Sequence, residues 1–188
     1  IAPPIAPPVA PPVDPPITYY GWISVATPAP ISDLWYFDLA VGQWYLYVQS
    51  GSATALQDLT NVNTPSSSSD PGPRQGHAGY FSNNNFYVFG GKGKDTLGSY
   101  GYLNDFFRFD TSSTPNWAYI TGSPTLGSQG STSSPSARAR ASAWVGNSGN
   151  LWLSFGYGVD GNGVTDSYLA STWKYEIGGV WSLVGGST

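Results

Sequence analysis

One pattern occurs three times in this chain and constrains its fold more than any other feature. An aromatic residue, a gap, a second aromatic residue and an acid are followed by a short turn and a Trp. The three copies are Leu34–Asp38 with Trp44, Phe106–Asp110 with Trp117, and Thr172–Glu176 with Trp181. The alternation predicts a half-buried strand, a turn, and a second strand that begins at the Trp. The chain is therefore predicted to be built from similar β-hairpins.

The second and third copies are each preceded by a matching hairpin. The paired markers are Pro71 with Pro135, Arg74 with Arg138, His77 with Ala141, and Phe86–Gly91 with Leu151–Gly156. Arg74 and Arg138 lie 64 residues apart, and Phe107 and Trp173 lie 66 apart. Each of these two copies therefore supplies four predicted strands.

Composition favours the same fold class. Aromatic residues make up 15% of the 188 residues, and short aromatic runs alternate with Gly, Ser, Asn and Pro clusters. Glu176 is the only glutamate, and no long window carries apolar residues at helical spacing. The sequence predicts an all-β protein.

The combination of motifs resembles the kelch family. Its carriers here are the Pro-x-x-Arg opening, Phe89-Gly90-Gly91, Asn104-Asp105 before the aromatic strand, and Trp117 after Asp110. The resemblance implies four-stranded β-propeller blades of about 50 residues each. It covers roughly residues 31–188, with blade-like repeats near 31–48, 71–122 and 135–185 in a β domain over 17–188.

The last copy departs from the family pattern at two places. Phe155-Gly156-Tyr157 stands in place of Phe89-Gly90-Gly91, and Ala170-Ser171 in place of Asn104-Asp105. We therefore expect the last blade to be degenerate.

The number of strands bears on assembly. The copies, with one further strand at Trp22–Val25, account for about eleven strands, whereas the smallest closed propeller needs about sixteen. We expect a partial or open propeller of about three blades, whose free sheet edges favour self-association.

The resemblance also implies structural residues within the blades. Arg74 and Arg138 would hold neighbouring blades, with acids at Asp38, Asp110 and Glu176 as partners. The predicted structural tryptophans are Trp44, Trp117 and Trp181.

The first sixteen residues form a separate segment, a tetrapeptide repeat in which each unit ends in Pro-Pro. Proline fixes φ and drives its predecessor to extended geometry, so this arm is predicted to be a polyproline II rod about 50 Å long. The arm resembles hydroxyproline-rich extracellular glycoproteins, which implies hydroxylated and O-glycosylated prolines; an unmodified spacer is the alternative. The prolines concerned are Pro3, Pro4, Pro7, Pro8, Pro11, Pro12, Pro15 and Pro16.

Charge and composition argue against several functions. Seven basic and eleven acidic residues give a net charge of -4. A nucleic-acid binder needs an excess of basic residues to contact phosphates, so the sequence argues against this function. No apolar stretch approaches the roughly 18 residues that span a bilayer. Cysteine is absent and His77 is the only histidine, so the copper radical chemistry of some kelch relatives is excluded and no catalytic residue, metal or cofactor is predicted.

One loop has a partial metal-binding pattern. Asp160-Gly161-Asn162-Gly163 begins like an EF-hand loop, but Val164 stands where an oxygen ligand is required and Ser171 where a bidentate Glu is required. We interpret it as a glycine-rich turn, with weak calcium binding through Asp160 and Asp166 as the alternative.

These observations predict a non-enzymatic structural subunit of an extracellular fibre or surface appendage, forming a homo-oligomer or filament through the arm and the open sheet edges. The alternative is a carbohydrate- or protein-binding kelch module of a larger secreted protein; an enzyme using carboxylates alone ranks last. The aromatic residues predicted to contact a ligand or another subunit are Tyr19, Tyr20, Trp22, Tyr45 and Tyr47.

Overall fold

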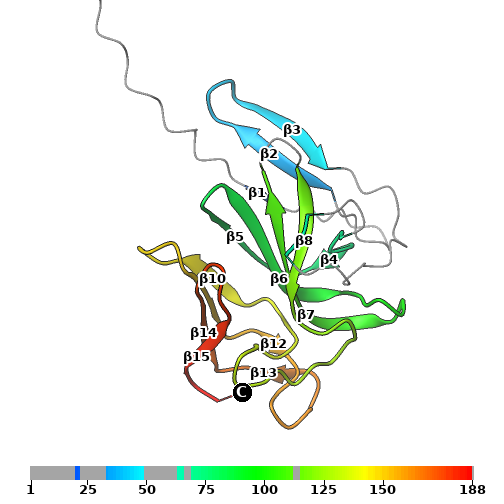
Figure 1. The fold of residues 1–188 in the computed structure, drawn as a ribbon. Coiled ribbons are helices and arrows are strands. Elements are labelled where there is room, and N and C mark those ends of the chain that lie inside the picture. The colour runs from blue at the N-terminus through cyan, green and yellow to red at the C-terminus, as the bar shows by residue number, and fades with distance from the viewer. Residues whose placement is uncertain (1–19, 22–32, 49–62, 66–68, 112–114, 188) are drawn as a thin grey trace, which may run out of the picture.

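The computed structural model describes residues 20–21, 33–48, 63–65, 69–111 and 115–187. Across these residues the protein is all-β, with fifteen strands in four sheets and no helix (Figure 1). No helix of this part of the chain is long and apolar enough to cross a membrane. The proline arm and the predicted strand at residues 22–25 lie outside the described residues.

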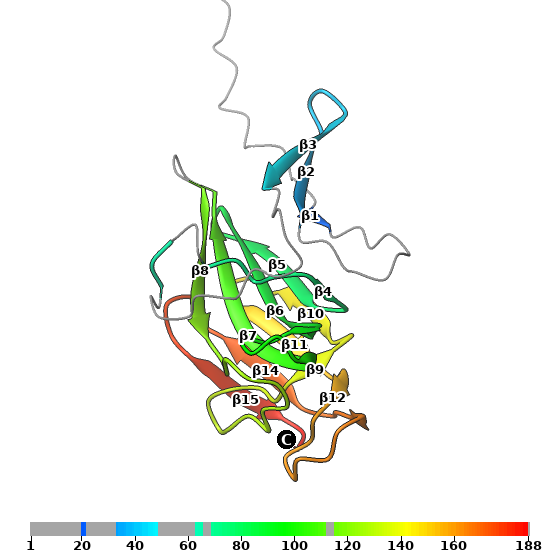
Figure 2. The same ribbon diagram turned by 90° about the vertical axis from the view of Figure 1, so that its right-hand side faces the viewer.

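The N-terminal sheet contains β1 (Tyr20–Gly21), β2 (Leu34–Asp38) and β3 (Gln43–Val48), in that order. The β2–β3 hairpin is the first copy of the repeated pattern. Its turn is closed by the Asp38 carboxylate, which accepts a hydrogen bond from the Ala40 amide at 2.8 Å. This sheet lies at one end of the molecule, at the top of Figures 1 and 2.

The central sheet is the middle copy. It contains β4 (Arg74–Gln75), β5 (Ala78–Ser82), β6 (Asn85–Lys94), β7 (Tyr100–Asp110) and β8 (Asn116–Thr121). Strands β5 to β8 pair in chain order, and β4 pairs with the second half of β6. Asn83 and Asn84 connect β5 to β6 with φ of 49° and 57°, the left-handed pair that a two-residue hairpin turn requires.

The last copy is divided between two sheets. The C-terminal sheet contains β10 (Ser142–Val145), β11 (Leu151–Ser154), β14 (Thr172–Tyr175) and β15 (Trp181–Gly185). The small sheet contains β9 (Arg138–Ala139), β12 (Tyr157–Gly158) and β13 (Ser167–Tyr168). The C-terminal sheet is thus a complete antiparallel set of four strands, in spite of the altered motifs of this copy.

The main core lies between the central and C-terminal sheets, which pack face to face (Figure 2). Phe106 of β7 contacts Tyr175 and Trp181, with ring centroids 4.9 and 5.2 Å away. Trp173 and Trp181 are both almost fully buried. The opposite face of the central sheet has its own apolar cluster, which includes Leu34 of β2 and Trp117 of β8. Each described sheet is open, since its first and last strands do not pair with each other.

The backbone angles decide between the two matchings of this segment of the last copy. In the middle copy Gly90 and Gly91 take φ of 59° and 100°, and in the last copy Phe155 and Gly156 take 63° and 107°. Phe155 therefore corresponds to Gly90, as in the pairing of Phe86–Gly91 with Leu151–Gly156, and the matching of Phe155 with Phe89 is wrong. At Gly90 a side chain is impossible, because a Cβ atom there would lie 2.7 Å from the Arg138 carbonyl oxygen.

Candidate ligand-binding groove

Arg74 is held in place by a buried network at the start of the middle copy. Its Nη1 and Nη2 donate to the two carboxylate oxygens of Asp105 at 2.6 and 2.8 Å, and both side chains are fully buried. Nη1 also donates to the Gly90 carbonyl at 2.9 Å, and Nη2 donates to the Pro71 carbonyl. The arginine thereby joins the strand it starts, the bend of β6 and the middle of β7.

Arg138 occupies the same position in the last copy with neutral partners. Its Nη2 donates to the hydroxyls of Ser171 and Ser136, and Nη1 donates to the Phe155 carbonyl, each at 3.0 Å. No carboxylate among the described residues pairs with it. Burial therefore lowers the pKa of Arg138 to about 10.

The predicted acid partners of these arginines are wrong. The partner of Arg74 is Asp105, and Ser171 stands at the equivalent place for Arg138. Asp38 closes its own turn, and Glu176 pairs with Lys174 at 2.7 Å. The acids were expected at the end of each aromatic strand, whereas the arginine reaches the middle of that strand.

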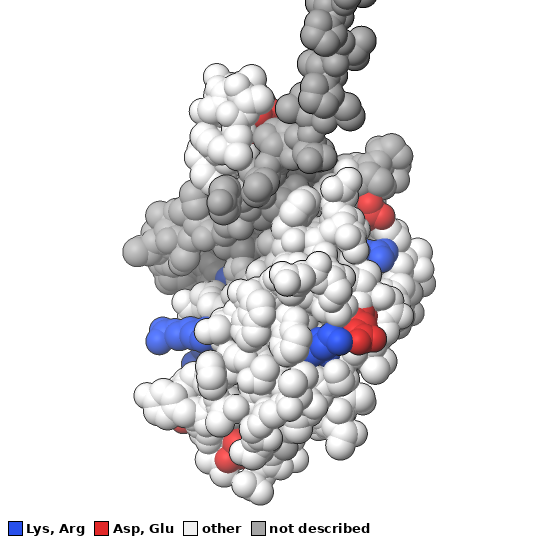
Figure 3. Space-filling model, turned by 90° about the vertical axis from the view of Figure 1, so that its left-hand side faces the viewer, with Lys and Arg blue, Asp and Glu red and all other residues white. Residues whose placement is uncertain are grey.

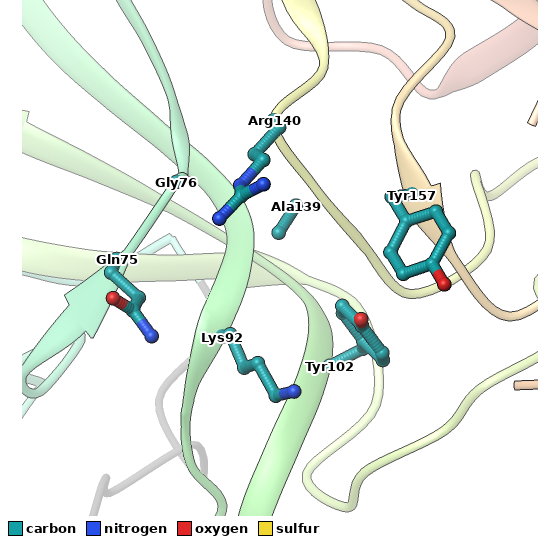
Figure 4. Close-up of a pocket in the computed structure, with 7 residues that line it drawn as sticks. All are labelled: Gln75, Gly76, Lys92, Tyr102, Ala139, Arg140 and Tyr157. Carbon is teal, nitrogen blue, oxygen red and sulfur yellow. The ribbon is translucent and has the colours of Figure 1, made fainter. Parts of the chain in front are cut away.

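A groove lies where the middle and last copies meet, and its lining includes Gln75 and Ala139, which follow the two buried arginines in sequence (Figure 4). Its cavity of about 370 Å³ is lined by equivalent positions of the two copies: Gln75, Gly76, Lys92 and Tyr102 from the middle copy and Ala139, Arg140 and Tyr157 from the last. A second hollow of about 650 Å³ shares Arg140 and Tyr157 with the first. The groove therefore continues along the last copy toward Phe155 and Tyr168.

Two cations and three tyrosines give the groove its chemistry. The Lys92 ammonium lies 4.8 Å from the centre of the Tyr102 ring. Tyr157 contacts Tyr102 and Tyr168, with ring centroids 6.1 and 5.0 Å away. The Tyr102 hydroxyl donates to the Asp166 carboxylate at 2.7 Å, and burial together with this acid raises the pKa of Tyr102 to about 12. A surface of this kind can hold an anionic group and stack against a flat ring.

The residues of this groove were not predicted as a site. Lys92, Arg140 and the tyrosines are far apart in sequence, and Tyr157 and Tyr168 are not part of the repeated aromatic pattern. One signal was available: Arg140 replaces Gly76 when the two copies are aligned on Arg74 and Arg138.

The predicted contact aromatics lie elsewhere. Tyr45 is 38% exposed on β3 and stacks on Tyr36 at 5.2 Å. Tyr20 lies in β1 and Tyr47 in β3, whereas Tyr19 and Trp22 fall outside the described residues.

The three predicted structural tryptophans are in different surroundings. Trp117 and Trp181 are buried in the two cores, whereas Trp44 is 51% exposed beside Phe37. Trp44 is therefore exposed where its two counterparts are buried, and its role as a structural residue of a blade stays a prediction.

The Asp160 loop is a turn in which the Asp160 carboxylate accepts hydrogen bonds from backbone amides. Asp160 Oδ1 accepts hydrogen bonds from the amides of Asn162 and Val164 at 3.0 and 2.8 Å. No cluster of three or more possible metal-binding side chains occurs among the described residues.

Comparisons with known proteins extend the description of the fold. No family model matches the chain, and no curated protein is similar to it. The solved structure of YjhT is similar, with a TM-score of 0.55 and 17% sequence identity. The similarity covers 83% of this chain and 46% of YjhT, so this chain spans less than half of that protein. At this identity the similarity concerns the all-β fold alone.

Proposed function

We propose that this chain is a non-enzymatic structural subunit of an extracellular fibre or surface appendage, in which kelch-like blades of neighbouring copies pack on one another. The observation that carries the proposal is the exposed aromatic face of the C-terminal sheet. Trp144 is 43% exposed and stacks on Trp152 with ring centroids 5.7 Å apart and an interplanar angle of 9°. These rings lie on the side of the sheet opposite to the buried Trp173.

A second apolar surface supports open-ended assembly. On the N-terminal sheet Trp44 and Leu46 share one face of β3 and are 51% and 41% exposed. A contact between two different surfaces of the same chain repeats without closing, unless the rotation happens to form a ring. We propose that the C-terminal sheet of one copy packs on the N-terminal sheet of the next.

Low charge supports the same function. Charged residues make up 10% of the sequence, against about 25% in ordinary domains. Figure 3 shows one face on which charged side chains are few and scattered among uncharged ones. Repulsion between copies is correspondingly weak.

The repeat architecture supports kelch-like blades. Two sets of four antiparallel strands pack face to face, and buried arginines occupy matching positions in both. The proline arm, residues 1–16, would connect neighbouring copies and carry the glycans.

The experiment is analytical sedimentation with negative-stain microscopy on the full chain and three variants. We expect filaments from the wild type, and a monomer from Trp144→Lys and from a chain lacking residues 1–16. Leu97→Lys is the matched control, because Leu97 is 75% exposed and lies on neither surface. Circular dichroism establishes that each variant is folded. A wild-type chain that stays monomeric at all concentrations, or a Trp144→Lys variant that still forms filaments, would refute the proposal.

A second candidate function is a carbohydrate- or protein-binding module, and the groove between the copies is the observation that favours it. Its cations and exposed tyrosines lie on different elements from Trp144 and Trp44. Binding and assembly can therefore be tested separately.

A further inference from the structure

Arg140 has a backbone conformation that ordinarily belongs to glycine. Its φ is 58°, and the equivalent residue of the middle copy is Gly76, with φ of 64°. Residues with side chains adopt this region rarely, and such strain is typical of functional positions. Glycine would satisfy the turn without strain, so the arginine side chain calls for another explanation.

Gly76 leaves room for the arginine side chain. A Cβ atom at Gly76 would lie 3.2 Å from Cγ of Arg140, and the Arg140 amide donates to the Gly76 carbonyl at 2.6 Å. The two equivalent positions thus face each other across the junction, one without a side chain and one with a long cationic side chain (Figure 4). The side chain of Arg140 occupies space that is available because Gly76 has no side chain.

The two cations of the groove, Arg140 and Lys92, form no ion pair within the part of the chain that the structure describes. The carboxylate of Asp166 accepts a hydrogen bond from the hydroxyl of Tyr102, a residue that lines the groove. The arrangement therefore provides two positive charges for an anionic group from outside the chain.

Exposed rings continue the groove beyond Arg140. Tyr168 is 91% exposed and Phe155 is 56% exposed, and both line the adjoining hollow with Tyr157. Rings in an open groove stack on the apolar faces of sugars, while tyrosine hydroxyls hydrogen-bond to sugar hydroxyls. An open hollow lined by several aromatic rings suits a chain of sugar rings better than the single inserted side chain of a peptide.

We propose that this groove binds an acidic saccharide whose sugar residues carry carboxylates, as uronic acids do. Arg140 and Lys92 hold a carboxylate, and Tyr157 and Tyr168 stack on neighbouring rings. The inference rests on the second candidate function, to which it adds a ligand class, and it is independent of assembly.

The experiment is titration calorimetry of the full chain with a hexamer of galacturonic acid. The comparison ligands are the methyl-esterified hexamer, a neutral glucose hexamer and a glutamate hexamer. We expect binding of the acidic sugar alone, weakened by salt because it depends on charge.

Arg140→Gly is the decisive variant, because it installs the residue of the equivalent position and removes strain rather than adding it. We expect at least about a tenfold loss of affinity in Arg140→Gly, as for removal of a charge-assisted bidentate contact. Lys94→Gln is the control; it removes one positive charge from a residue of β6 that does not line the groove. We expect its affinity to stay within about twofold of the wild type.

Four results would overturn the inference: Arg140→Gly binding as tightly as the wild type, equal binding of the methyl ester, binding of the glutamate hexamer in place of the sugar, or binding of the neutral hexamer alone. The last of these would still support a carbohydrate-binding module, but one whose ligand is not acidic. Sedimentation of Arg140→Gly reports on assembly separately and is expected to match the wild type.

Discussion

Exchanging the residues that face the two buried arginines tests how the copies are held together. Asp105→Ser gives Arg74 the partner that Arg138 already has, and Ser171→Asp gives Arg138 the partner of Arg74. Both arginines keep their carbonyl acceptors, at Gly90 and Phe155 respectively. Each variant therefore changes the charge of the side chain that faces the arginine, while the other hydrogen-bond partners of the arginine stay the same.

The expected loss in Asp105→Ser follows from Arg138. Burial lowers the pKa of Arg138 to about 10. Starting from an ordinary value of about 12.5 and at about 1.4 kcal/mol per pKa unit, the buried charge costs roughly 3 kcal/mol. Because the folded-state pKa is the lower one, this cost is fully present below pH 10 and disappears only as the pH rises through the unfolded-state pKa. Breaking a buried ion pair generally costs about 3–5 kcal/mol, which agrees.

We therefore expect Asp105→Ser to lower the free energy of unfolding at pH 7 by about 3 kcal/mol. Ser171→Asp should raise it by about 1–2 kcal/mol, since a charge-assisted hydrogen bond gains more than the new carboxylate loses on burial. Ser171→Asn, which is similar in size to the aspartate but neutral, should give no such gain.

The assay is urea unfolding followed by tryptophan fluorescence, because Trp173 and Trp181 are buried between the two sheets. A loss below about 1 kcal/mol in Asp105→Ser would refute the reasoning, since it would mean that a serine hydroxyl and the carbonyl oxygens stabilise the buried charge of Arg74 almost as well as the carboxylate does. A destabilised Ser171→Asp variant would refute the assumption that the two sites are equivalent.

Three further predictions concern single positions. Burial lowers the pKa of His77 to about 3, so at pH 5 the imidazole is neutral in the folded protein and binds a proton on unfolding. Between pH 8 and pH 5 the free energy of unfolding, measured in urea, should therefore fall by about 2 kcal/mol more in the wild type than in His77→Gln. Equal decreases in the two proteins would contradict this. Gly90→Ala should lower the free energy of unfolding by more than about 2 kcal/mol, because the new Cβ would lie 2.7 Å from the Arg138 carbonyl; an unchanged melting temperature would show that the sheets yield easily. Asn84→Gly should stabilise the hairpin between β5 and β6 by about 0.5 kcal/mol, since φ at Asn84 is 57°, and a lower urea midpoint would refute this.

Local patterns in the sequence predicted the strands well, because alternation and turn residues are local properties. The aromatic strand at Phe106–Asp110 and the strand that begins near Trp117 are both present, in β7 and β8. The all-β class is confirmed for the described residues. The blade assignment, the filament and the glycosylated arm remain predictions.

Contacts across the junction could not be predicted in the same way. The correspondence of Asp105 with Ser171 was visible in the aligned copies, but the reach of Arg74 to the middle of β7 depends on the bend of β6 at Gly90. The sequence supports two matchings of Phe155, with Gly90 and with Phe89, and only the backbone angles show that the first is correct. The groove was not predicted because it forms between residues of two different copies, and the sequence does not show how the copies pack on each other.

The core shared by the central and C-terminal sheets makes each copy a template for the next. Neither copy encloses its own apolar side chains, because Phe106 and Trp181 fill one layer from opposite directions. A last copy expressed by itself would expose Trp173 and Trp181 together, and would lack the surface on which they order. The middle and last copies are therefore expected to fold and unfold as one cooperative unit, because neither buries its own aromatic side chains without the other.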